Sequence, residues 1–122
     1  MKDDLLKIIS FYGVMPQLKY FQSEVFELNE AIIRYEELNN HIGDLEVYDI
    51  DETELKKEHI AEEIADCEIF LRQFREYYNI SENDIENIIK YKIDRTIKRM
   101  EVGYYDNWNL ERHRRLSQLP NI

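Results

Sequence analysis

Apolar residues recur every three or four positions over most of the chain, which is the pattern of amphipathic helices. The first such segment spans residues 3–12, where Leu5, Ile9 and Tyr12 share one face of the expected helix. Gly13 is a suitable end point for it, and Pro16 suits the first turn of the next helix, where no N–H donor is needed. The pattern therefore predicts a short helix followed by a longer one.

Two long apolar stripes follow, over residues 16–39 and 54–79. The first stripe comprises Leu18, Phe21, Val25, Leu28, Ile32 and Tyr35. The second comprises Ile60, Ile64, Cys67, Leu71, Phe74 and Tyr78. Steps of three and four place each set on one side of an α-helix, and that side is the one expected to be buried.

A fourth helix is predicted over residues 82–101. Ser81 can cap its first turn, with Asp84 three residues later. Gly103 suits its C-terminal end. Its apolar stripe comprises Ile85, Ile89, Ile93, Ile97 and Met100. Because the chain holds only 3 Gly and 2 Pro, the many tight turns of an all-β fold are not expected.

The sequence therefore predicts one all-α domain of about four helices over residues 1–103. Residues 40–53 are acidic and lack a helical period, so we expect a loop there, with a short extended stretch around residues 47–50. Residues 104–122 form a mixed C-terminal tail that contains the only Trp of the chain. Four helices enclose little volume, so we expect a homodimer or homotetramer to complete the bundle.

Charge and cysteine content exclude several classes of function. The chain has 26 acidic and 16 basic residues and a formal net charge of −10, which disfavours binding to a nucleic-acid polymer. The single Cys67 excludes an intramolecular disulfide and a multi-cysteine zinc site. No apolar run has membrane-spanning length, and the first residues do not resemble a signal peptide. We therefore expect a cytoplasmic protein with no membrane partner.

Four acidic residues stand at matching positions on the two long helices. Glu24, Glu27, Glu63 and Asp66 each directly precede an apolar residue of their helix's stripe. Each is therefore expected on one shoulder of its helix, about 100° from the buried line. If the two helices pack together, four carboxylates converge, and Mg²⁺ or Mn²⁺ would relieve their repulsion. The alternative is a solvated acidic face, which is common in so acidic a chain.

Basic residues on the fourth helix could complete a site for a polyphosphate. Lys92, Arg95 and Arg99 step by three and four along one face. Cations beside a carboxylate-bound metal suit phosphate oxygens. The alternative is a set of ion pairs with the acidic helices. His59 lies one turn before Glu63, where a capping or packing role is more usual than metal ligation.

Two of these segments resemble a known family. FQSEVFELNEAI (21–32) resembles the E-x-x-E-L motif of the MazG-like all-α nucleoside triphosphate pyrophosphohydrolases, and HIAEEIADCEIFL (59–71) resembles their E-E-x-A-D motif. YKIDRTIKRM (91–100) is similar to the family's following helix. One departure is the spacer: 35 residues separate Glu27 from Glu63, which is longer than usual in the family.

The resemblance implies a helical bundle, dimeric or tetrameric, that hydrolyses a nucleoside triphosphate to the monophosphate and pyrophosphate with Mg²⁺. The metal ligands would be Glu24, Glu27, Glu63 and Asp66, and Lys92 and Arg95 would lie near the phosphates. Two alternatives stay open. One is an acidic helical interaction module without chemistry, and the other is the same chemistry on a phosphoribosyl nucleotide.

Overall fold

The computed structural model describes residues 1–40 and 50–103, and the side chains of residues 1–38 and 56–103. The helices are α1 (Lys2–Tyr12), α2 (Val14–Asn40), α3 (Ile50–Tyr77) and α4 (Glu82–Glu101). The described residues form no strand, so the prediction of an all-α fold of about four helices is confirmed. Within these ranges no helix combines the length and apolar composition that crossing a bilayer requires.

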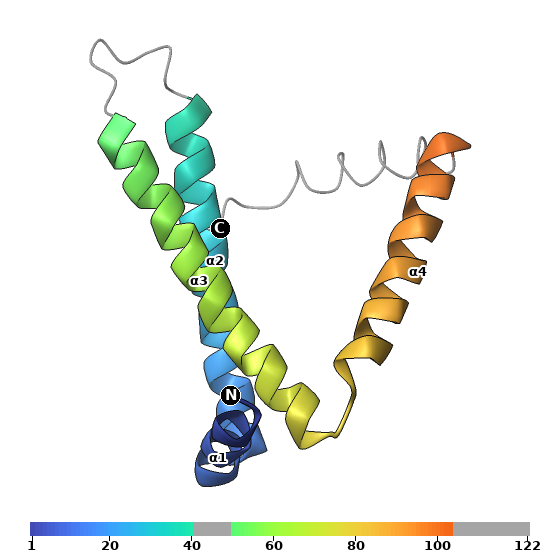
Figure 1. The fold of residues 1–122 in the computed structure, drawn as a ribbon. Coiled ribbons are helices and arrows are strands. Elements are labelled where there is room, and N and C mark those ends of the chain that lie inside the picture. Colours follow the sequence, from blue (N-terminus) through green and yellow to red (C-terminus); the bar gives the residue numbers. More distant parts are fainter. Residues whose placement is uncertain (41–49, 104–122) are drawn as a thin grey trace. The chain divides into compact units, whose positions relative to one another are not determined.

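The chain divides into two compact units, residues 1–80 and residues 81–122. In the first unit, α2 and α3 run antiparallel and side by side (Figure 1). The helix α1 packs against both of them, at the end of the pair where α2 begins and α3 ends. Its buried residues are Leu5 and Ile9, and the Nζ of Lys2 lies 3.7 Å from a carboxylate oxygen of Glu76 on α3.

The ends of the first three helices follow local chemistry. Gly13 ends α1 with φ +91°, a backbone conformation that glycine adopts without steric cost. The helix α3 begins at Ile50, so residues 50–53 belong to this helix and the prediction of a loop there is wrong. Residues 41–49 of the predicted loop lie outside the described residues.

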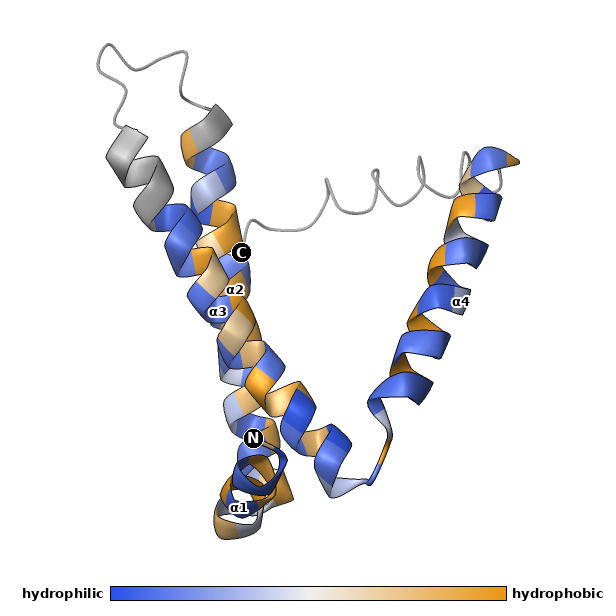
Figure 2. Ribbon diagram, in the orientation of Figure 1, coloured by the Kyte–Doolittle hydropathy of each residue, from blue (hydrophilic) through white to orange (hydrophobic). Residues whose placement is uncertain are grey.

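In the second unit, α4 has the predicted ends. The Oγ of Ser81 accepts a hydrogen bond of 3.0 Å from the backbone N–H of Asp84. Gly103 follows the helix with φ +73°. No residue of α4 is buried among the described residues, and Ile89, Ile93 and Ile97 are 43%, 55% and 46% exposed. The apolar stripe of α4 is visible along the helix in Figure 2. The predicted tail, residues 104–122, lies outside the described residues.

Buried and half-buried residues mark the seam between α2 and α3. On α2 this seam consists of Gln17, Phe21, Glu24, Leu28, Ala31, Tyr35 and Leu38. On α3 the line runs through Ile60, Glu63, Cys67, Phe70 and Phe74, and the half-buried Asp66 and the buried Gln73 adjoin it. The steps alternate between three and four residues, which is the spacing of a coiled-coil interface. The ring of Phe21 lies 6.0 Å from that of Phe70 and 5.7 Å from that of Phe74, measured between centroids.

This seam corrects the predicted stripes. Leu18, Ile64 and Leu71 were expected to be buried but are 37%, 42% and 53% exposed. Glu63, which was expected on the shoulder of its helix, is only 6% exposed. Two adjacent lines on each helix carry apolar residues, and only the packing of the helices selects which line is covered. Glu24 and Glu63 consequently lie in the seam itself rather than about 100° from it, whereas Glu27 is exposed.

Candidate metal centre

Three of the four predicted acidic ligands meet between α2 and α3. One carboxylate oxygen from each of Glu24, Glu63 and Asp66 lies within 4.8 Å of the others. We call these three residues the acid cluster. The antiparallel packing of two helices brings Glu24 opposite an i, i+3 pair on α3, where both carboxylates project from one helix face. The expectation that acids from the two helices converge is therefore correct for these three residues.

The acid cluster contains carboxylate oxygens that lack partners. The Oε2 atoms of Glu24 and Glu63 are both buried, and neither has a hydrogen-bond partner within the described structure. The side chain of Glu63 is only 8% exposed. A buried polar atom without a partner typically costs about 1–3 kcal/mol, and more when it is charged. These oxygens therefore favour a bound cation or a proton.

The electrostatics of the acid cluster also favour a bound cation or a proton. Burial raises the pKa of Glu24 from 4.5 to about 7, with further contributions from the charges of Glu27, Asp66 and Glu63. Burial and the three acid-cluster charges also raise the pKa of the Cys67 thiol. This thiol is therefore a small buried group rather than a reactive nucleophile.

The donor set fits a hard divalent cation. Carboxylate oxygens are preferred by Mg²⁺ and Mn²⁺. Two oxygens bound to one Mg²⁺ lie at most about 4.2 Å apart, since each Mg–O distance is about 2.1 Å. The carboxylate oxygens of the acid cluster, which lie within 4.8 Å of one another, are close to the separation that a single ion requires. The residues present therefore fit the metal that the sequence predicted.

The fourth predicted ligand is not part of this group. Glu27 is exposed, one turn along α2 from Glu24, and its negative charge is the largest charge contribution to the raised pKa of Glu24. Its ligation of a metal stays a prediction. On α3, the Nε2 of His59 lies 3.7 Å from Oε1 of Glu63, and its Nδ1 lies 4.0 Å from Oε2 of Glu62. Sequence reasoning did not single out Glu62, although its i, i+3 spacing from His59 was readable.

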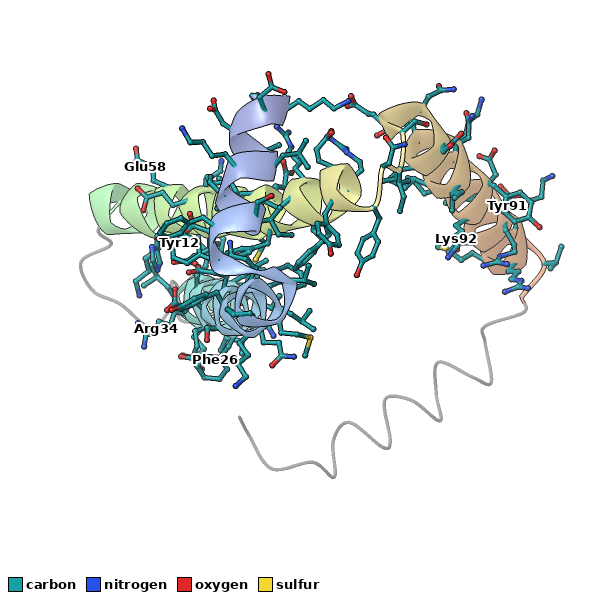
Figure 3. The ribbon with its side chains drawn as sticks, turned by 90° about the horizontal axis from the view of Figure 1, so that it is seen from below. Tyr12, Phe26, Arg34, Glu58, Tyr91 and Lys92 are labelled. Atoms are coloured by element: carbon teal, nitrogen blue, oxygen red, sulfur yellow. The ribbon has the colours of Figure 1, made fainter. Side chains whose placement is uncertain are left out.

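The predicted phosphate-binding residues are on α4, in the second unit. Lys92 is exposed and projects from the helix in Figure 3. The guanidinium of Arg95 lies 5.6 Å from the ring centroid of Tyr91, which is a cation–π contact on the same helix. The binding of phosphate by Lys92 and Arg95 stays a prediction.

Comparisons with known proteins supply no relative. No family model, no curated protein and no solved structure matches this chain.

Proposed function

We propose that this protein is a metal-dependent nucleoside triphosphate pyrophosphohydrolase. The observation that supports the proposal most directly is the acid cluster. It joins Glu24 on α2 to Glu63 and Asp66 on α3, and two of its buried oxygens lack partners. These are three of the four positions at which the two motifs of the MazG-like family resemblance require a metal ligand. The alternative of a merely solvated acidic face does not fit a Glu63 that is 6% exposed.

In this proposal the acid cluster holds Mg²⁺, and Mn²⁺ is the alternative ion. When bound, the metal polarises the phosphorus under attack and lowers the pKa of the attacking water. Glu24, Glu63 and Asp66 fix its position, so the triphosphate is oriented for release of pyrophosphate. Lys92 and Arg95 neutralise the negative charge that develops on the leaving pyrophosphate.

We also propose that the active form is a homodimer or homotetramer. The apolar stripe of α4 supports this, because within its own unit no residue of the helix is buried and Ile89, Ile93 and Ile97 are about half exposed. Amphipathic helices of soluble proteins normally cover such a face. A second copy of the chain would do so while bringing two sets of helices together.

A panel of ribonucleoside and deoxyribonucleoside triphosphates tests the proposed activity. Each is incubated with the full chain and Mg²⁺, and pyrophosphate and orthophosphate are measured separately. We expect equal amounts of monophosphate and pyrophosphate, with turnover lost when EDTA removes the metal. A phosphoribosyl nucleotide is included, because the same chemistry can act on it. Binding of Mg²⁺ without hydrolysis of any of these compounds would contradict the proposal.

The interaction module is the competing function, and the exposed stripe of α4 is the observation that favours it. Divalent metal distinguishes the two functions. A ligand that binds only the folded state stabilises it by about 2.7 kcal/mol at a concentration 100 times its Kd. If the protein is the proposed enzyme, we expect millimolar Mg²⁺ to raise its melting temperature. The melting temperature of a module without a metal site would change little.

A further inference from the structure

Each of the helices α2 and α3 carries a second line of apolar residues beside the seam. The members of each line are seven residues apart, so they share one side of a helix that follows a heptad pattern. Five of the six residues are 37–60% exposed and the sixth is half-buried, so the described residues do not cover them fully. We call these six residues the apolar side of the helix pair: Leu18, Val25 and Ile32 on α2, and Ile64, Leu71 and Tyr78 on α3.

Both lines lie on the same side of the pair. In each helix, the members of the line come one residue after the seam positions, in the direction from the N- to the C-terminus. Because α2 and α3 run antiparallel (Figure 1), this step turns toward the same side of the pair on both helices. Leu18 and Leu71 are at the same level, since the hydrogen bond between Gln17 and Gln73 joins residues close to them. The apolar side is therefore one continuous surface across two helices.

The opposite side of the pair carries α1 and Asp66 of the acid cluster. Asp66 follows Ile64 by two residues, which is a turn of about 200° around α3. The ion pair between Lys2 and Glu76 holds the start of α1 against α3, and Glu76 is about 140° around this helix from Leu71. Neither α1 nor Asp66 therefore occupies the apolar side. A partner bound there leaves the acid cluster open to a substrate.

The apolar side carries no net charge, although the formal net charge of the chain is −10. Gln22 and Asn29 form its edge along α2 and are uncharged, and the charges of Glu68 and Arg75 cancel along α3. Two copies of so acidic a chain repel each other, so a neutral side is the one on which they can pack together. The Nε of Arg75 is buried and has no acceptor within the described structure, and a second copy can supply one.

The pattern of apolar lines identifies the kind of partner. Two lines of each helix are used in the seam, and the apolar side adds a third. Three lines are typical of helices in the core of a bundle, whereas a simple pair of helices requires two. The α2–α3 pair is therefore half of a four-helix bundle, and an identical pair from a second copy has the pattern that completes it.

The size of the surface is sufficient for a stable dimer. The 27 residues of α2 correspond to a length of about 40 Å, and two adjacent helices are about 20 Å wide. Their product is about 800 Å², which is the area that each partner contributes to a standard stable interface. Monomeric proteins rarely expose an apolar patch of more than a few hundred Å².

We infer that two copies of this chain associate through their apolar sides and form a four-helix bundle. In this bundle α2 of each copy packs against α3 of the other, around a two-fold axis parallel to the helices. Facing helices then run antiparallel, and Leu18 of one copy meets Leu71 of the other. The inference rests on the proposed homo-oligomeric state and names the surface of the first unit that forms it.

The variant Leu71→Asp tests the interface. We expect the mass of the full chain in sedimentation to fall to one half, and the dissociation constant to rise by about 100-fold or more, because an unpaired charge would be buried. Ile69→Asp is the matched control. Ile69 is 44% exposed on the same helix but is turned by about 200° from Leu71, so the mass is expected to stay unchanged. Circular dichroism checks the fold of both variants.

A mixing experiment tests which copy supplies the partner. Leu18→Lys is expected to weaken association in the same way as Leu71→Asp. When the two variants are mixed in equal amounts, the new lysine of one chain meets the new aspartate of the other. We therefore expect the mixture to recover the mass of the unmodified chain, and this recovery is expected to weaken at high salt. Two copies of one variant cannot form this ion pair.

Two results would overturn the inference. The first is a Leu71→Asp protein with the mass of the unmodified chain; if its melting temperature also falls, α4 of the same chain covers the apolar side. The second is a reduced mass that the mixture does not restore, which would assign the apolar side to another partner. If Leu71→Asp does not fold, Leu18→Lys with Tyr20→Lys as control decides the question, since Tyr20 is 57% exposed and turned by about 200°.

These outcomes are separate from those of the proposed activity. If the unmodified chain hydrolyses a triphosphate but Leu71→Asp keeps its mass, the pyrophosphohydrolase proposal stands and the apolar-side interface fails. If Leu71→Asp loses half the mass and the mixture recovers it, the interface stands even when no triphosphate is hydrolysed.

Discussion

The side-chain amide of Gln17 on α2 donates a hydrogen bond of 2.8 Å to the amide oxygen of Gln73 on α3, across 56 positions of sequence. Both residues are almost fully buried, at 4% and 1% exposure. A buried amide pair is stable only while both partners are present, since neither can turn to water. The bond therefore fixes the register of α2 against α3 at the end of the pair opposite residues 40 and 50.

This pair allows a stability test by double-mutant cycle. Gln73→Ala or Gln17→Ala is expected to lower the free energy of unfolding by about 1–3 kcal/mol, because each leaves a buried amide without its partner. The double variant Gln17→Ala/Gln73→Ala is expected to lose less than the sum of the two single losses, because it leaves no amide without its partner. Urea denaturation measures all four proteins. Additive losses from the two alanine variants would show that the amides are not coupled.

Neutralising Glu63 tests the acid cluster. Glu63→Gln is expected to reduce Mg²⁺-dependent turnover by about 100-fold or more and to abolish stabilisation by Mg²⁺. Without metal, its melting temperature is expected to stay level or rise, because one source of repulsion is gone. Glu58→Gln is the control, since Glu58 is exposed and projects from α3 away from α2 (Figure 3). A fully active Glu63→Gln protein would remove this residue from the site.

The raised pKa of Glu24 predicts a pH dependence of the metal-free protein. Its pKa is about 7 in the folded state and near 4.5 in the unfolded chain, so the folded state binds the proton more tightly. The favourable contribution of protonated Glu24 to the free energy of unfolding is fully present below about pH 4.5. It is lost as the pH rises to about 7. Melting curves of the chain and of Glu24→Gln are expected to diverge over this range, in the absence of metal.

The same group predicts that metal binding releases a proton. At pH 6, Glu24 is mostly protonated in the metal-free protein and must ionise to bind Mg²⁺. Mg²⁺ affinity is therefore expected to rise with pH up to about 7 and then level off. Calorimetric titration in buffers of different ionisation enthalpy counts the protons. A count that does not change between pH 5.5 and 8.5 would contradict this linkage.

Lys92 is expected to bind phosphate rather than to stabilise the fold. Lys92→Ala should reduce kcat/KM by about 10- to 1,000-fold, the range for losing a charge-assisted contact in a site closed to water. The melting temperature without metal should change little. Lys90→Ala is the matched control, since two residues along a helix turn the side chain by about 200°. Lost stability with normal turnover would assign Lys92 to structural ion pairs instead.

The exposed stripe of α4 predicts the oligomeric state. Sedimentation at micromolar concentration is expected to give a species of at least twice the 14.9 kDa chain mass. Ile93→Asp introduces a charge into the stripe and should shift this species toward the monomer. Asn87→Asp adds the same charge on the other side of the helix and should leave the assembly unchanged. A monomer in the unmodified chain would contradict the proposed assembly.

The fold class and most helix ends were readable in the sequence because they depend on local chemistry. A period of three to four apolar residues specifies a helix whatever it packs against. The cap at Ser81 and the positive φ at Gly13 are likewise properties of a few neighbouring residues. The start of α3 was not predicted, because its first turn is acidic rather than apolar and so carries no hydrophobic period.

The identity of the acid cluster was only partly determined by sequence. The matching spacing on two helices singled out Glu24, Glu63 and Asp66, but it equally singled out Glu27, which is exposed. Adjacent lines of each helix are both apolar, so periodicity could not decide which line becomes the seam. Packing of α2 against α3 made that choice, and with it buried Glu63 and the Gln17–Gln73 pair. Burial in turn raised the pKa of Glu24, an effect of the low dielectric between two helices that no single helix possesses.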